Sequence, residues 1–202
     1  MTGLQTAARD VEPAPAAEFD AIVIGAGVSG LYQLYRLRQL GLTVRVLETG
    51  TGVGGTWYWN RYPGARFDSE SYTYGYSFSQ ELLEEWDWEE RFSGQPENER
   101  YLNYVADKFD LRRDIQCNSR VTAAHYQEDT RSWDVVLEDG RHYRTHLLIT
   151  AVGVHKPELA GVISRVFGED ELPAVRRPAL KERTIVGTEV GQLPNIAPIG
   201  IH

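Results

Sequence analysis

Residues 19–30 read FDAIVIGAGVSG, and this stretch decides the fold. The apolar run over residues 19–24 has the length of a buried strand, and a glycine follows it directly. Apolar residues at helical spacing then predict a helix over residues 28–40 that stops near Gly41. Residues 43–47, TVRVL, alternate as a second strand. A strand, a helix and a strand of these lengths form a βαβ unit, so we expect the two strands to be parallel.

Three glycines at the first strand-to-helix junction form the pattern G-x-G-x-x-G, at Gly25, Gly27 and Gly30. The first permits a tight turn, the second lets backbone approach a pyrophosphate, and the third lets the helix pack closely on the strand. The helix N-terminus adds free N–H donors for phosphates. Glycine-rich turns are common, but here the required strand, helix and second strand surround the motif. The pattern therefore predicts a dinucleotide-binding domain.

Glu48 ends the second predicted strand, where an acidic side chain can accept hydrogen bonds from ribose hydroxyls. The alternative is a solvated carboxylate at a strand end. An acid here argues against a ribose 2′-phosphate, so we expect FAD or NAD rather than NADP at this site. A second glycine turn, GGTW at residues 54–57, favours FAD because it can bring backbone against a long, extended cofactor. Its alternative is a surface loop.

The rest of the chain carries weaker patterns. Residues 56–78 are crowded with aromatic side chains and show no clean period. The expected elements are two helices over residues 80–88 and 96–109, three short strands over 115–126, 132–137 and 141–148, and a buried strand over 147–153. The turn Glu138–Asp139–Gly140 predicts a hairpin.

Composition narrows the function. The 202 residues carry a formal net charge of -8, which disfavours nucleic acid as a partner. The single cysteine, Cys117, excludes an intramolecular disulfide and fits a reducing cytosol. We find no apolar stretch long enough to span a bilayer, no signal peptide and no metal-site pattern. We therefore expect a cytoplasmic protein without a membrane partner, with a flexible leader over residues 1–18.

Residues 19–153 resemble the flavin-dependent Baeyer–Villiger monooxygenases, the group of phenylacetone and cyclohexanone monooxygenases. The most specific part is GGTWYWNRYPGARFDSES at residues 54–71. Further similarity lies in YGYSFS (74–79), EWDW (85–88) and RYLNYVADKFDLR (100–112). The resemblance implies an α/β fold: a Rossmann-like FAD-binding domain over 19–153, with a parallel sheet and a small antiparallel β element. Residues 154–202 do not resemble the family's continuation, so we expect an irregular, atypical tail there.

The resemblance also implies the chemistry. In this family, reduced FAD reacts with oxygen to a C4a-peroxyflavin, which attacks a ketone and yields an ester or lactone, while NADPH supplies the hydride. By similarity, the cofactor-binding residues form three groups. They are Gly25, Gly27, Ser29 and Gly30 at the pyrophosphate; Glu48 at the ribose and Val121 near the adenine; and Gly55, Thr56, Trp57, Asp68 and Tyr74 towards the flavin.

Arg66 and Asp68 are the catalytic residues that the resemblance implies. The family places them beside the isoalloxazine and the nicotinamide, with Asp68 paired to an arginine from a later part of the chain. From the residues alone, the favoured interpretation is a loop ion pair between the two, with the aromatic residues around them as ordinary core.

Three parts of the family pattern are missing from this sequence: a second G-x-G-x-x-G for NADPH, the signature between the two nucleotide domains, and the distal half. After HKPEL at residues 155–159 the similarity fades, and QLPNI at 192–196 resembles that exit region but stands out of place. We therefore expect a truncated monooxygenase that is poorly active or inactive without a missing domain or a partner chain. The alternatives are a non-catalytic flavin- or dinucleotide-binding fragment and a flavin monooxygenase that oxidises nitrogen or sulfur. YPGARFDSES favours the Baeyer–Villiger type over the latter.

Overall fold

The structure is a computed structural model that describes residues 17–153 and 186–187. The strands are β1 (Ala17–Ile24), β2 (Val44–Leu47), β3 (Ile115–Gln116), β4 (Val121–Gln127), β5 (Ser132–Leu137), β6 (His142–Thr150) and β7 (Val186–Gly187). The helices are α1 (Val28–Gln39), α2 (Thr56–Trp59), α3 (Gln80–Glu85) and α4 (Gln95–Lys108), with single 3-10 turns at Ser71–Thr73 and Arg112–Asp114. Apart from β7, the predicted tail over 154–202 lies outside the described residues. Residues 1–16 of the predicted leader also lie outside them, and its last two residues, Ala17 and Glu18, belong to β1.

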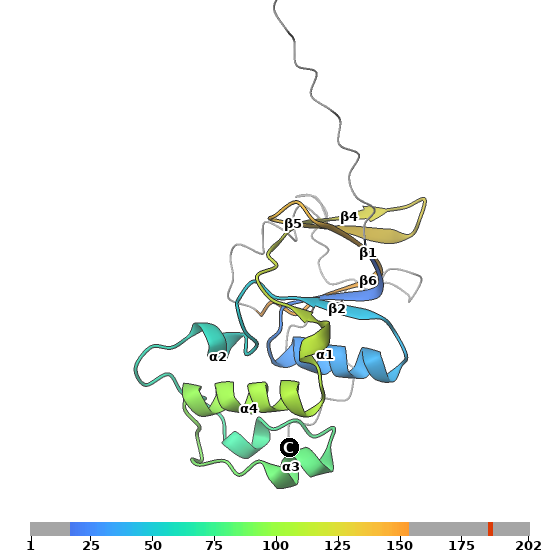
Figure 1. The fold of residues 1–202 in the computed structure, drawn as a ribbon. Coiled ribbons are helices and arrows are strands. Elements are labelled where there is room, and N and C mark those ends of the chain that lie inside the picture. The colour runs from blue at the N-terminus through green and yellow to red at the C-terminus, as the bar shows by residue number, and fades with distance from the viewer. Residues whose placement is uncertain (1–16, 154–185, 188–202) are drawn as a thin grey trace, which may run out of the picture.

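One sheet carries the fold, in the order β3-β2-β1-β6-β5-β4, with β7 beside β6. Figure 1 shows α1 and α4 below this sheet. β1 pairs in parallel with β2 and β6, and β3 pairs in parallel with β2. β4, β5 and β6 are antiparallel neighbours. The predicted βαβ unit and the α/β class are confirmed. The antiparallel element is a continuation of the parallel sheet rather than a separate piece.

The bounds of three predicted strands were wrong. Residues 115–126 form β3 at one edge of the sheet and β4 at the other, because the chain turns at Asn118, whose φ is 50°. The strands predicted over 141–148 and 147–153 are one strand, β6, which ends at Thr150 and changes from an antiparallel partner, β5, to a parallel one, β7, along one edge. The helix expected over residues 80–88 ends at Glu85.

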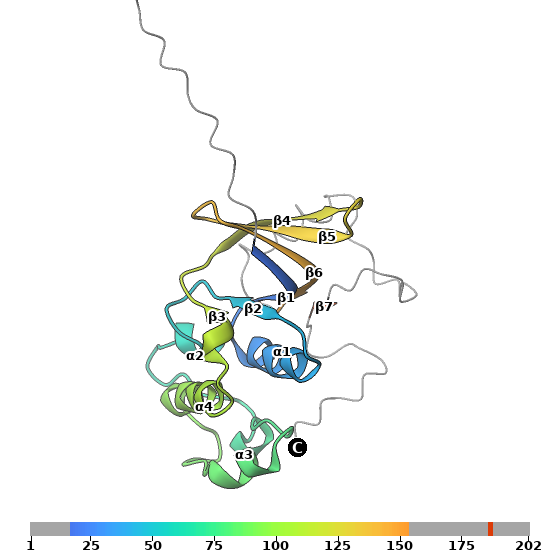
Figure 2. The ribbon, with the colours of Figure 1, turned by 45° about the vertical axis from the view of Figure 1, so that its right-hand side comes forward.

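β1 is buried on both faces, which explains its unbroken apolar run. Ala21 and Val23 face the core shared with α1 and α4, whereas Ile22 and Ile24 face a second core with β4, β5 and β6. Figure 2 shows α1 beneath β1 and β2, α4 beside and below it, and α3 farther from the sheet. The glycine turns follow β1 and β2, at the carboxyl ends of adjacent parallel strands, where open α/β sheets bind ligands.

Candidate functional site

Two glycines of the first motif occupy positions where any side chain would strike backbone. A Cβ on Gly25 would lie 2.6 Å from the carbonyl oxygen of Ala151, and its φ is +101°. A Cβ on Gly30 would lie 1.9 Å from the carbonyl oxygen of Gly25. Gly25 therefore permits the turn, and Gly30 permits α1 to pack against the end of β1.

Gly27 faces the second glycine turn. A Cβ on Gly27 would lie 3.3 Å from Cα of Gly55, and a Cβ on Gly55 would lie 2.8 Å from Cα of Gly27. The N–H of Gly54 also donates to the carbonyl of Ala26, at 3.0 Å. The two glycine turns thus pack backbone to backbone. Because Gly54 and Trp57 are buried, the GGTW segment is not a surface loop.

The N-terminus of α1 is open to an acceptor. Gly27 is the N-cap and makes no side-chain capping bond, and the first turn has no acidic residue. Within the described part of the chain, the N–H groups of Val28, Ser29 and Gly30 have no hydrogen-bond acceptor. Free N–H groups and the positive end of the helix dipole suit an anionic ligand such as a pyrophosphate.

Glu48 is buried, with only 5% of its surface exposed, so it is not the solvated carboxylate of the alternative interpretation. Its Oε2 accepts a hydrogen bond from the N–H of Ala26, and its Oε1 accepts one from the N–H of Gly50, both at 2.7 Å. The carboxylate therefore links the first turn to the loop after β2. Each oxygen keeps a second lone pair that could accept a ribose hydroxyl.

The sequence did not indicate this bridging role of Glu48. The backbone of Glu48 is fixed as well, since its N–H donates to Gln116 at 2.9 Å and its carbonyl accepts from Ser119 at 2.8 Å.

Val121, expected near the adenine, is half-buried at the start of β4 and packs against the core that contains Leu47. No hydrogen bond joins Val121 and Glu48 in the described region.

Trp57 and Tyr74, both predicted to lie towards the flavin, are in direct contact. Trp57 is buried, and its Nε1 donates to the hydroxyl of Tyr74 at 2.7 Å. The two rings meet edge to face, and Phe67 packs on both. The side-chain amide of Gln95 donates to the carbonyl of Trp57 at 2.5 Å, which fixes α2 against α4. Thr56, the first residue of α2, is exposed.

Burial raises the pKa of Tyr74 to about 12, against the hydrogen bond from Trp57, which lowers it. A phenol with a raised pKa in the folded state stabilises the fold fully below about pH 10, and this contribution is lost as the pH rises towards 12. We expect Tyr74→Phe to reduce the decrease in unfolding free energy at alkaline pH by on the order of 2 kcal/mol. Denaturant unfolding between pH 9 and pH 12 measures this, with the exposed Tyr62→Phe as control. Equal pH slopes in both variants would contradict it.

Arg66 and Asp68 are both exposed and do not pair with each other. The guanidinium of Arg66 donates to Glu90 and to the carbonyl of Phe92. Asp68 makes no hydrogen bond or ion pair within the described ranges. The loop ion pair between the two residues is therefore absent there, and their catalytic roles stay predictions from the resemblance.

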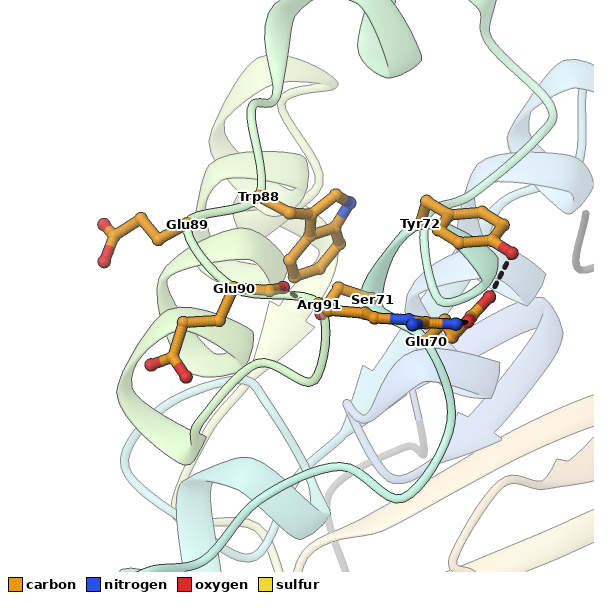
Figure 3. Close-up of a pocket in the computed structure, with 7 residues that line it drawn as sticks. All are labelled: Glu70, Ser71, Tyr72, Trp88, Glu89, Glu90 and Arg91. Atoms are coloured by element: carbon orange, nitrogen blue, oxygen red, sulfur yellow. Dashed lines mark hydrogen bonds and ion pairs between the residues drawn. The ribbon is translucent and has the colours of Figure 1, made fainter.

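An open hollow of about 450 Å³ lies beside this segment rather than at the glycine turns. Figure 3 shows its lining, which comes from residues 70–72 and 88–91. Glu70 accepts hydrogen bonds from both Tyr72 and Arg91, so these polar groups satisfy one another. None of the residues predicted to bind the cofactor lines the hollow. We therefore place the candidate site at the glycine turns.

The part of the chain that the structure describes contains neither a candidate metal site nor a candidate membrane-spanning helix. No group of three or more His, Cys, Asp or Glu residues there could hold a metal ion. None of the described helices combines the length and the apolar character needed to cross a membrane.

Comparisons with known proteins match the part of the chain that contains the two glycine turns. Residues 23–85 match the model of the NAD(P)-binding Rossmann-like domain family. Acetone monooxygenase (methyl acetate-forming) of Gordonia sp. (strain TY-5) is 54% identical over 135 residues, which are 67% of this chain and 25% of that protein. A phenazine N-monooxygenase of Lysobacter antibioticus is 47% identical over 137 residues, with coverages of 67% and 25%.

The solved structure of an oxidized steroid monooxygenase bound to NADP matches with a TM-score of 0.67 and 51% identity, over 68% of this chain and 26% of that one. The chain thus spans about a quarter of the length of each of these proteins, and the matched part is N-terminal in them.

Proposed function

Because the chain belongs to the family of flavin-dependent Baeyer–Villiger monooxygenases, we propose that residues 17–153 form the FAD-binding part of such an enzyme. One observation carries the proposal: the buried carboxylate of Glu48 joins the first glycine turn to the loop after β2, beside the open N-terminus of α1. Acid, glycine turns and free N–H groups are the three features that a dinucleotide requires.

The residues present fit FAD. The N–H groups of residues 28–30 would hold the pyrophosphate, with the absence of a side chain at Gly27 leaving the approach open. Glu48 would accept the ribose hydroxyls. Trp57, the last residue of the second glycine turn, and its hydrogen-bond partner Tyr74 would lie along the flavin half. Bound FAD would supply the redox chemistry, and these side chains would bind and orient it.

The reaction we propose for the complete enzyme is the NADPH-dependent insertion of oxygen into a ketone, to give an ester or lactone. The similarity to a methyl acetate-forming acetone monooxygenase supports this class of substrate. Arg66 and Asp68 would act beside the flavin, together with residues from the three quarters of the relatives' length that this chain does not span. We expect the 202-residue chain with FAD, NADPH and acetone in air to form no methyl acetate; steady ester formation would show that the chain carries the whole activity.

Oxidation of a ring nitrogen is the second candidate, because a phenazine N-monooxygenase is 47% identical over the same share of the chain. The FAD site would be the same in both cases. A longer protein containing this segment would separate them: ketone-dependent NADPH oxidation supports the first candidate, and phenazine-dependent oxidation supports the second.

Nucleotide competition tests the cofactor assignment. We expect ADP to displace bound FAD, and adenosine 2′-phosphate 5′-diphosphate to displace it at least about tenfold less well, because its 2′-phosphate would meet the Glu48 carboxylate. Flavin fluorescence follows the displacement. Equal competition by the two nucleotides would place the ribose away from Glu48.

A further inference from the structure

Tyr76 connects the two halves of the candidate site. Its phenol is buried, and its hydroxyl donates to the carbonyl of Val28 at 2.6 Å. Val28 is the first residue of α1, next to the N–H groups that would bind the pyrophosphate. Tyr76 itself belongs to the same segment as Tyr74, which meets Trp57 on the other half of the site.

The position of Tyr76 is set from a third element. Its backbone N–H donates to the hydroxyl of Tyr101 at 2.7 Å, and Tyr101 lies almost fully buried on α4. The ring of Tyr76 packs against Tyr32 of α1 and against Phe78. The hydroxyl that donates to Val28 is thus the polar end of the Tyr76 side chain, which α4, α1 and its own segment hold in place.

From this geometry we infer that Tyr76 is a positioning residue for the dinucleotide. The Tyr76 hydroxyl holds the first turn of α1 in register with the Trp57–Tyr74 pair. The inference rests on the proposed function and extends it to a residue with no cofactor contact of its own. Burial raises the pKa of Tyr76 well above its usual value, so the phenol stays a hydrogen-bond donor at alkaline pH as well.

Removing the hydroxyl separates positioning from simple stabilisation. In an α-helix the carbonyl of Val28 also accepts the N–H four residues on, so Tyr76→Phe leaves that carbonyl with its helical partner. The phenylalanine keeps the ring packing. The variant should therefore fold almost normally and lose mainly the tether between the first turn of α1 and the Tyr74 segment.

Tyr35→Phe is the matched control. The ring of Tyr35 stacks on Phe78 in the same aromatic cluster, but its hydroxyl accepts from Gln39 on the exposed side of α1. Both variants lose one hydroxyl from one cluster. Only Tyr76→Phe removes a bond to the turn that would hold the pyrophosphate.

The experiment measures the Kd of FAD and of ADP for the full 202-residue chain and both variants, together with the unfolding midpoint of each cofactor-free protein. Tyr76→Phe should weaken FAD about fivefold, the size of one lost hydrogen bond, and ADP by less, because ADP spans only one half of the site. Tyr35→Phe should leave both affinities within about twofold.

Three results would overturn the inference. Unchanged FAD affinity with a lowered midpoint would make Tyr76 purely structural. Equal losses for FAD and ADP would show that the hydroxyl does not couple the two halves. A wild-type chain that binds ADP and not FAD would remove the proposed function, whereas the first two results would leave that function standing.

Discussion

Gly30→Ala is expected to lower the free energy of unfolding by about 3 kcal/mol or more. The added Cβ would lie 1.9 Å from the carbonyl oxygen of Gly25, which is backbone and cannot rotate away. Relief requires α1 to move off the end of β1, and this separates the parts of the first glycine turn. Alanine gains about 1 kcal/mol of helix propensity over glycine, which is too little to offset the clash. Denaturant unfolding measures the loss, and FAD affinity should fall with it.

Gly41→Ala provides the control at the other end of α1. Gly41 has a φ of +78° and no atom within 4 Å of its would-be Cβ. Its substitution should cost only the backbone strain, about 1 kcal/mol, and leave FAD binding unchanged. If the two variants were equally stable, α1 would not pack closely on the end of β1 at Gly30, which would contradict this account.

Glu48→Ala should show the second large effect. The change removes the acceptor of two buried backbone N–H groups, those of Ala26 and Gly50. Each buried donor left without a partner costs about 1–3 kcal/mol, so we expect a loss of roughly 4 kcal/mol in unfolding free energy. FAD affinity should fall more than about tenfold at temperatures where the variant is still folded, because the ribose acceptors are lost as well.

Glu97→Ala separates stability from binding in this test. Glu97, which lies on α4, has the same 5% exposure as Glu48. Within the described residues, its carboxylate accepts only one backbone N–H, that of Glu89. We expect about half the destabilisation of Glu48→Ala and an unchanged Kd for FAD. An equal effect of the two substitutions on FAD affinity would return Glu48 to a purely structural role.

Local patterns were sufficient for the front of the fold. The apolar run of β1, the helical spacing of α1 and the alternation of β2 each depend on neighbours in sequence, and all three elements form within a few residues of their predicted bounds. The positions of Gly25 and Gly30 were also predictable, because a strand-to-helix turn of this type requires glycine whatever packs around it.

Features that depend on distant residues could not be predicted in this way. Nothing near Asn118 shows that the chain leaves one edge of the sheet and returns at the other. The contact of Gly27 with Gly55 and the hydrogen bond from the N–H of Ala26 to Glu48 arise only once β1 and β2 lie side by side. The pairing of Arg66 with Glu90 likewise joins two loops far apart in sequence.

The measurement that tests the central claim most directly is a titration of the purified 202-residue chain with FAD, followed by gel filtration and a visible absorption spectrum. Residues 17–153 should retain one FAD per chain, with a flavin spectrum perturbed from that of free FAD. Glu48→Ala, kept below its unfolding temperature, should emerge with little flavin. A wild-type chain that is folded and still emerges colourless at saturating FAD would contradict the assignment of the glycine turns and Glu48 as a flavin site.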